Sequence, residues 1–187
     1  QDEDLKKAIK YFLMAGNGGY AKAFWFLGSI YRDKSFDVFN PDKAFSFYML
    51  GAELGDTNSY ENLARAYERG EGVNRDIKKS VFWYMKALQS EDKDDVSGAA
   101  YSLGSIYKYN SPEVSNSFDK AVSFFNMAIE ESDEGSYEAG ASYELADMYL
   151  KGHGVEVNYL KAVELFKTAH NKGMKRATEW LTRNGEL

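Results

Sequence analysis

Residues 23–31 read AFWFLGSIY, and three later stretches repeat their spacing of small, large and aromatic side chains: SYENLARAY at 59–67, AAYSLGSIY at 99–107 and ASYELADMY at 141–149. In each stretch a small residue is followed four positions later by a leucine, then at once by a second small residue, and finally by a tyrosine four positions after the leucine. These offsets share one face of an α-helix. The pattern predicts four copies of one helix, helix A, whose column leucines are Leu27, Leu63, Leu103 and Leu145.

A second pattern follows each tyrosine and occurs once more near the start of the chain. A small residue is followed by large apolar residues at offsets three and four, and by another small residue at offset seven. This spacing also keeps to one helical face. It predicts a helix B in five copies, whose first small residues are Ala8, Ala44, Ser80, Ala121 and Ala162.

Residues that commonly begin and end helices border the B pattern. Capping side chains are expected before four B helices, and Pro41 stands where its missing N–H costs nothing; the expected caps are Asn40, Asn74, Ser117 and Asn158. A left-handed residue commonly ends a helix, and three B helices are closely followed by a glycine suited to that role: Gly16, Gly55 and Gly173.

The order of the patterns predicts an all-α fold built from helix pairs. We expect a single repeat domain over 1–187, with a leading helix B in 1–20, helix pairs in 21–58, 59–98, 99–140 and 141–176, and a capping or truncated helix A in 177–187. Because one pair cannot bury its apolar face alone, neighbouring pairs are expected to share a continuous core. Since the leading helix B lacks its partner, we also expect at least one further helix before Gln1 in the native protein.

Composition excludes several classes of function. The 187 residues include no cysteine and two histidines, which excludes disulfides and thiolate sites and leaves little scope for a catalytic triad or a zinc cluster. The net charge of −6 argues against nucleic acid as a partner, and no apolar run approaches the ~20 residues that span a bilayer. We expect no enzyme activity, no cofactor and no metal. The lack of cysteine slightly favours export over the cytoplasm and leaves the compartment open.

The loops complete the pattern. Gly70-Glu71-Gly72-Val73 and Gly152-His153-Gly154-Val155 follow the second and fourth tyrosines, whereas the loops after Tyr31 and Tyr107 lack the glycine pair. Together with the A and B columns, this sequence resembles the Sel1-like repeat, a relative of the tetratricopeptide repeat. The resemblance implies a right-handed α/α superhelical solenoid of antiparallel helix pairs, with A helices on the concave side, and a role as a binding scaffold.

If A helices line a groove, their outward positions form its candidate surface. These lie two residues before and two and five residues after each column leucine. In the last copy the third of these positions holds Leu150, and we expect the others to bind protein: Trp25, Ser29, Arg32, Glu61, Arg65, Glu68, Tyr101, Ser105, Lys108, Tyr143 and Asp147. Aromatic and arginine side chains dominate interface hot spots. For Trp25, Tyr101 and Tyr143 the alternative is ordinary packing between helices.

Two connections between repeats carry clusters of acidic side chains: Glu91, Asp92, Asp94 and Asp95 in one, and Glu130, Glu131, Asp133 and Glu134 in the other. They are candidates for an acidic rim that steers a basic partner. The alternative is that both are solvated loops that aid solubility.

These patterns favour a non-enzymatic scaffold or adaptor that presents its groove to a protein or peptide, with no nucleic acid as partner and no membrane insertion. The alternative is a bacterial immunity protein that neutralises a toxin through one tight contact. A hydrolase is the third and least favoured function. The partner's identity and the oligomeric state are not encoded in these patterns.

Overall fold

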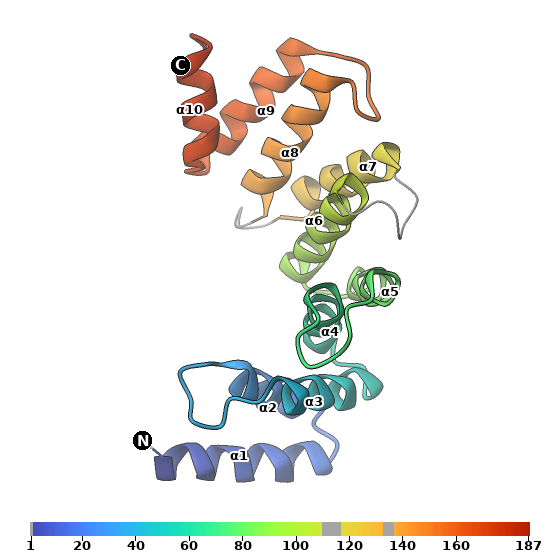
Figure 1. Ribbon diagram of the computed structural model, residues 1–187, viewed down its shortest axis with the longest axis vertical. Helices are drawn as coiled ribbons and strands as arrows, with labels where there is room; N and C mark the ends of the chain where they lie inside the picture. Colours follow the sequence, from blue (N-terminus) through green and yellow to red (C-terminus); the bar gives the residue numbers. More distant parts are fainter. Residues whose placement is uncertain (1, 110–116, 133–136) are drawn as a thin grey trace. The chain divides into compact units, whose positions relative to one another are not determined.

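The computed structural model describes residues 2–109, 117–132 and 137–187 of the chain, and within them it contains ten α-helices and no strand (Figure 1). The helices are α1 (Asp2–Asn17), α2 (Lys22–Arg32), α3 (Pro41–Glu53), α4 (Thr57–Arg69), α5 (Ile77–Ala87), α6 (Lys93–Tyr109), α7 (Phe118–Glu130), α8 (Glu138–Lys151), α9 (Tyr159–Asn171) and α10 (Lys175–Arg183). Helices α2, α4, α6 and α8 are the predicted A helices, and α1, α3, α5, α7 and α9 are the B helices. The all-α fold class is confirmed.

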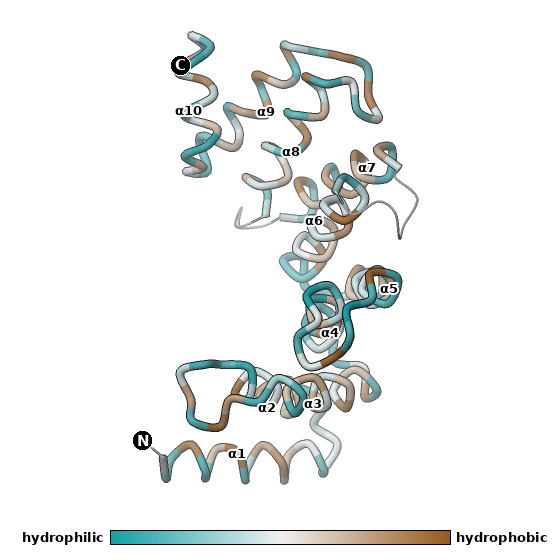
Figure 2. Tube along the Cα trace, in the orientation of Figure 1, coloured by the Kyte–Doolittle hydropathy of each residue, from teal (hydrophilic) through white to brown (hydrophobic). Residues whose placement is uncertain are grey.

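The chain divides into two compact units. Unit 1 runs from Gln1 to Ala87 and contains α1 to α5, and unit 2 runs from Leu88 to Leu187 and contains α6 to α10. In both units each A helix packs against the B helix that follows it, and against the helix that precedes it within the same unit. Figure 2 shows hydrophobic and hydrophilic residues alternating along the helices, as amphipathic helices require.

The residues of the two columns form the cores. The four column leucines are between 0% and 1% exposed, as are the B-helix rings of Tyr48, Tyr84, Phe125 and Phe166. In α10, Ala177 and Leu181 are fully buried at the column positions expected of a last helix A. Burying a ring or a leucine removes apolar area worth ~2–3 kcal/mol from water, so the columns account for why these helices pack.

Glycine at the second small position lets a B-helix ring approach an A helix closely. A Cβ atom added to Gly28 would overlap the ring of Tyr48, and one added to Gly104 would lie 2.7 Å from the ring of Phe125. The same contact therefore joins α2 to α3 in unit 1 and α6 to α7 in unit 2. It explains why the column requires a small residue there.

Three A-to-B loops end in the same backbone hydrogen bond, whether or not they contain glycines. The N–H of the residue before helix B donates to the carbonyl of the column tyrosine: Asn40 to Tyr31 at 2.7 Å, Asp76 to Tyr67 at 2.8 Å and Asn158 to Tyr149 at 3.0 Å. The loop after Tyr31 lacks a residue of positive φ and turns instead where the Ser35 N–H donates to the Asp33 carboxylate. The loop after Tyr107 includes residues 110–116, outside the described part.

Side-chain capping agrees with the sequence at three of four helices. Asn40, Ser117 and Asn158 accept hydrogen bonds from the third residue of the helix that each precedes. The expected cap Asn74 is wrong, because the Asp76 carboxylate accepts from the Lys79 N–H.

Two of the three expected left-handed glycines are confirmed. Gly55 and Gly173 have positive φ. Gly16 does not, because α1 continues past it to Asn17 and the left-handed residue is Gly19. A small residue is still required at Gly16, where an added Cβ would overlap the ring of Phe24.

Candidate functional site

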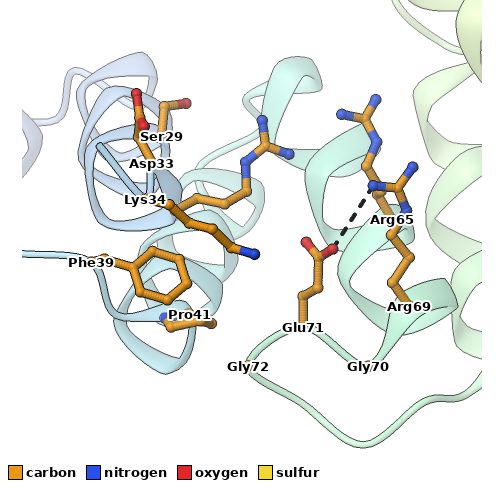
Figure 3. Close-up of a pocket in the computed structure, with 11 residues that line it drawn as sticks. Ser29, Asp33, Lys34, Phe39, Pro41, Arg65, Arg69, Gly70, Glu71 and Gly72 are labelled. Atoms are coloured by element: carbon orange, nitrogen blue, oxygen red, sulfur yellow. Dashed lines mark ion pairs between the residues drawn. The ribbon is translucent and has the colours of Figure 1, made fainter. Parts of the chain in front are cut away.

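The outward face of α2 and α4 in unit 1 borders a pocket of about 790 Å³. The helices contribute Ser29, Arg32, Arg65 and Arg69. The remaining wall comes from the two A-to-B loops and the first residue of α3: Asp33, Lys34, Phe39, Pro41, Gly70, Glu71 and Gly72 (Figure 3). Three of the predicted groove residues, Ser29, Arg32 and Arg65, thus meet at one cavity.

The second glycine of the Gly70-Glu71-Gly72 loop holds this wall in place. Gly72 has a φ of 70°, and an added Cβ would overlap the carbonyl of Pro41 at the start of α3. Only a residue without a side chain fits so close to that backbone. The glycine pair therefore presses the loop against the start of the preceding helix B, and Glu71 projects from it toward the pocket in Figure 3.

Positive charge dominates the lining of this pocket, although the whole chain carries a net charge of −6. Four side chains are cationic and two are acidic. Both acidic groups have local contacts: Asp33 accepts from the Ser35 N–H at 2.8 Å, and Glu71 lies 3.8 Å from Arg69. Outside the lining, Glu61 forms an ion pair with Arg65 one turn away on α4.

The hydroxyl of Tyr48 lies within the electrostatic influence of these charges. It is 3.5 Å from the Ser29 hydroxyl. Burial raises the pKa of Tyr48, while the Ser29 contact and the positive charges of Arg32 and Arg65 oppose the rise. The hydroxyl therefore stays protonated at neutral pH and remains a potential donor beside Ser29.

In unit 2 the corresponding positions form a network of ion pairs. Lys108 of α6, whose side chain is 4% exposed, lies 2.8 Å from both the Glu144 and the Asp147 carboxylates of α8. Its ammonium also donates to the Glu144 carbonyl. The Tyr109 hydroxyl donates to Glu144, and Lys151 lies 2.7 Å from Asp147. Every charge in this network has an opposite charge beside it.

This pairing sets the protonation states. Burial alone would lower the pKa of Lys108, but the hydrogen bonds to Asp147 and Glu144 outweigh it and raise that pKa. Burial would raise the pKa of Asp147, and the hydrogen bonds from Lys108 and Lys151 lower it below its ordinary value of 3.8. Partial burial and the bond to Glu144 raise the pKa of Tyr109 to about 12. The network is therefore a lysine–carboxylate lock between α6 and α8 at neutral pH.

The three aromatic candidates are half-buried against the cores of their units. Trp25 packs on the core around Tyr48, and Tyr101 and Tyr143 pack on the core of unit 2. Arg176 lies 4.6 Å from the centre of the Tyr143 ring. This placement matches the packing alternative, and a binding role for the three rings stays a prediction.

The remaining groove candidates have partners on neighbouring turns or helices. Glu68 accepts a hydrogen bond from Tyr84 of α5 at 3.0 Å. Ser105 hydrogen-bonds Tyr101 and thereby opposes the rise in the pKa of that tyrosine that burial causes. These contacts are structural, and they leave the binding role of Glu68 and Ser105 untested.

The acidic clusters lie at helix ends in unit 2. The Asp92 carboxylate accepts from the Asp94 N–H, and Asp95 accepts from the Ser90 hydroxyl, so both help to begin α6. Glu130 ends α7 and Glu131 follows it. Asp133 and Glu134 lie outside the described residues. The local bonds of Asp92 and Asp95 suit the solvated-loop alternative, and the acidic rim stays a prediction.

The two histidines have local contacts. His153 stacks on Phe118 at 4.4 Å, and the Nδ1 atom of His170 lies 2.8 Å from the Thr178 hydroxyl. Within residues 2–109, 117–132 and 137–187, no three His, Asp or Glu side chains gather as a metal site would require.

Column counting missed the loop residues of the pocket. Lys34, Phe39 and Glu71 lie outside the helices, so no helical offset identifies them. Arg69 and Glu144 do lie on A helices, at offsets that the count did not include. The signal for Glu71 was the glycine pair on either side of it, which indicates a loop packed tightly on the preceding helix B. The loop after Tyr31 has no such pair, so no comparable signal identified Lys34 and Phe39.

Sequence comparison identifies the class to which this chain belongs. Five Sel1 repeats match residues 1–20, 22–56, 57–92, 97–133 and 139–174, so the chain belongs to the Sel1 repeat family. Sel1 repeats mediate protein–protein interaction, and their fold is generally a non-catalytic scaffold. No helix in the described part of the chain has the length and apolar character to cross a bilayer.

Particular relatives are longer than this chain. Chitin synthase regulatory factor 2 of Schizosaccharomyces pombe is 25% identical over 192 residues, a match that covers 99% of this chain and 36% of the yeast protein. The exopolysaccharide production negative regulator of Rhizobium meliloti is 30% identical over 140 residues, covering 71% of this chain and 51% of that protein. The chain therefore spans about a third to a half of the length of these two relatives.

A solved structure supports the solenoid fold. A protective antigen of uropathogenic Escherichia coli with an SLR fold superimposes with a TM-score of 0.80 at 23% identity, over 95% of this chain and 36% of the antigen chain. At that identity the likeness concerns the fold alone. The predicted family and solenoid class are confirmed.

Proposed function

We propose that this chain is a non-enzymatic protein-interaction scaffold that holds a polypeptide segment against the outward faces of its A helices. The observation that carries the proposal is the pocket of unit 1, where Ser29, Arg32 and Arg65 meet at a cavity of about 790 Å³. That volume falls in the range of ligand sites, and its polar groups converge from two helices and two loops.

Two further observations support a scaffold role. Sel1 repeats recur over most of the chain, and two relatives are named as regulators, one of chitin synthase and one of exopolysaccharide production. A regulator that lacks chemistry of its own acts by binding another protein. The immunity role set out from the sequence stays a prediction, and a single partner held at nanomolar strength would favour it.

Affinity capture with a blocked pocket tests the proposal. Ser29→Trp fills the pocket, whereas Ser46→Trp adds the same ring to the exposed side of α3 and serves as the matched control. We expect the unaltered chain and Ser46→Trp to retain the same polypeptide from extracts of the source cells, and Ser29→Trp to retain at least about tenfold less. Circular dichroism melting verifies that both variants fold.

Two outcomes contradict the proposal. In one, the unaltered chain retains no polypeptide. In the other, all three proteins retain the same partner equally, which places binding away from the A-helix face of unit 1.

A further inference from the structure

The two units share a cation at one repeat position but differ in the residues of the next A helix that face it. Five residues after the column leucine, α2 has Arg32 and α6 has Lys108, both cations. The A helix that follows in each unit faces that cation with different residues. Unit 2 has the carboxylates Glu144 and Asp147, one residue before and two after Leu145, whereas the matching residues of unit 1 are Asn62 and Arg65.

Arg32 consequently lacks the partners that Lys108 has. Among residues 2–109, 117–132 and 137–187, the Arg32 side chain forms no ion pair and no hydrogen bond, and its charge acts on the adjacent Asp33 carboxylate, whose pKa it helps to lower. Asn62 lines the same small cleft as Arg32 but donates its amide to the Asn58 carbonyl. An arginine with five N–H donors thus borders the pocket beside a second arginine, Arg65, which is itself paired with Glu61.

The loops add one cation, Lys34, and two carboxylates, Asp33 and Glu71, to the lining. Lys34 reaches into the space between α2 and α4 from one side and Glu71 from the other (Figure 3). The contact of Glu71 is with Arg69, at 3.8 Å and with both side chains more than 40% exposed, so solvent weakens it. With four cations against two carboxylates, the lining retains an excess of positive charge, of which Arg65 is also paired with Glu61 outside the lining.

We propose that the unit 1 pocket binds a side-chain carboxylate of an acidic peptide segment, which takes beside Arg32 the place that Glu144 and Asp147 take beside Lys108. This inference rests on the proposed scaffold function and names its ligand class. Arginine forms paired hydrogen bonds with a carboxylate, and Ser29 adds a hydroxyl donor on the same wall. Phe39 and Pro41 supply apolar surface for the rest of the peptide.

Carboxylate is favoured over other anions because unit 2 shows the fit. There, two positions of the A helix that follows hold carboxylates, each with an oxygen 2.8 Å from the buried Lys108 ammonium. The spacing of consecutive A helices in that unit therefore suits a group of carboxylate size. Unit 1 has a cation, Arg32, at the position of Lys108, and Asn62 and Arg65 at the two positions that hold carboxylates in unit 2.

The test is a titration of the whole chain with fluorescein-labelled hexaglutamate, followed by anisotropy at low salt. Labelled hexaglutamine and inorganic phosphate as a competitor are the comparison ligands. We expect hexaglutamate to bind, hexaglutamine not to bind, and phosphate to compete only weakly. Arg32→Met should weaken hexaglutamate binding about tenfold or more, since charged hydrogen bonds are lost. Glu71→Gln should strengthen it about twofold, because it removes an acidic group from the lining.

Lys78→Met is the matched control. It removes one positive charge from the exposed surface of α5, away from the pocket, and should change affinity less than about twofold. Arg65→Asp installs the unit 2 residue in unit 1 and should abolish binding by placing a carboxylate in the pocket.

Three results would overturn the inference: no binding of hexaglutamate, equal weakening by Arg32→Met and Lys78→Met, or phosphate displacing the peptide at equal concentration. The scaffold proposal is judged separately. A partner that depends on Ser29 but is retained by Arg32→Met leaves the scaffold standing and removes the carboxylate, whereas loss of every partner from the unaltered chain removes both.

Discussion

Unit 1 and unit 2 have the same helix columns, but the charged side chains on the outward faces of their A helices are arranged differently. In unit 2 a buried lysine is enclosed by two carboxylates, while in unit 1 an arginine at the same repeat position borders an open pocket. Their cores, by contrast, repeat one contact, a B-helix ring against an A-helix glycine. The difference shows that the repeat restricts the inward residues and leaves the outward ones free to diverge between copies.

The largest expected effect is on the free energy of unfolding, which should differ between replacing Lys108 and replacing Arg32. Lys108→Met leaves Glu144 and Asp147 without their buried cation and should lower the free energy of unfolding of unit 2 by about 3 kcal/mol. Arg32→Met removes a cation without an ion pair and should change the stability of unit 1 by no more than about 0.5 kcal/mol.

Urea denaturation combined with amide hydrogen exchange, which reports each unit separately, measures both changes. If Lys108→Met and Arg32→Met lower the unfolding free energy equally, the difference between the paired Lys108 and the pocket-lining Arg32 is contradicted.

An intermediate loss of stability is expected at the loop glycine that both units share. Gly72→Ala and Gly154→Ala both force a side chain at positive φ into the backbone at the start of the preceding B helix, Pro41 in one unit and Phe118 in the other. Each should cost about 2–3 kcal/mol, combining backbone strain with overlap.

Gly70→Ala is the control, because its φ is also positive but its nearest neighbour would lie 3.5 Å away. It should cost only about 1 kcal/mol. Thermal melting of the three variants measures the difference, and equal melting temperatures would show that the loop does not press on helix B as described.

The smallest effect concerns pH. The pKa of Asp147 is lower in the folded chain than its ordinary value of 3.8, because its hydrogen bonds to Lys108 and Lys151 outweigh burial. A lowered pKa gives stability that is present above the ordinary value and is lost as the pH falls through the folded value.

Unfolding free energies measured between about pH 5 and pH 2 should therefore fall more steeply for the unaltered chain than for Asp147→Asn. Parallel pH profiles for the two proteins would mean that the Asp147 carboxylate adds nothing to the lock.

Much of the fold could be predicted because its signals are local. The repeated columns of small, leucine and aromatic residues predicted the helices, and Asn40, Ser117 and Asn158 were recognisable as caps. Asn74 was mistaken for a cap because two positions before the helix both offer a suitable side chain, and only the hydrogen bond to Lys79 distinguishes Asp76. Gly16 was mistaken for a helix end because glycine also serves close packing, as it does against Phe24.

The candidate site was only partly predictable. Helical offsets identified Ser29, Arg32 and Arg65, but not the loop residues that complete the pocket. They also grouped Arg32 with Lys108 as equivalent positions. Their difference depends on the following A helix, whose facing residues lie 30 or more positions further along the chain.

The amino-acid order alone determined which faces of the helices are apolar, because helical periodicity needs only neighbours within two turns. It also determined where the loops could approach a helix, because glycine is the residue that permits such contact. Tertiary structure decided which outward charges meet. Electrostatic pairing acts over a few ångströms in space between distant positions, so packing left Lys108 enclosed by acids and Arg32 beside an open cavity.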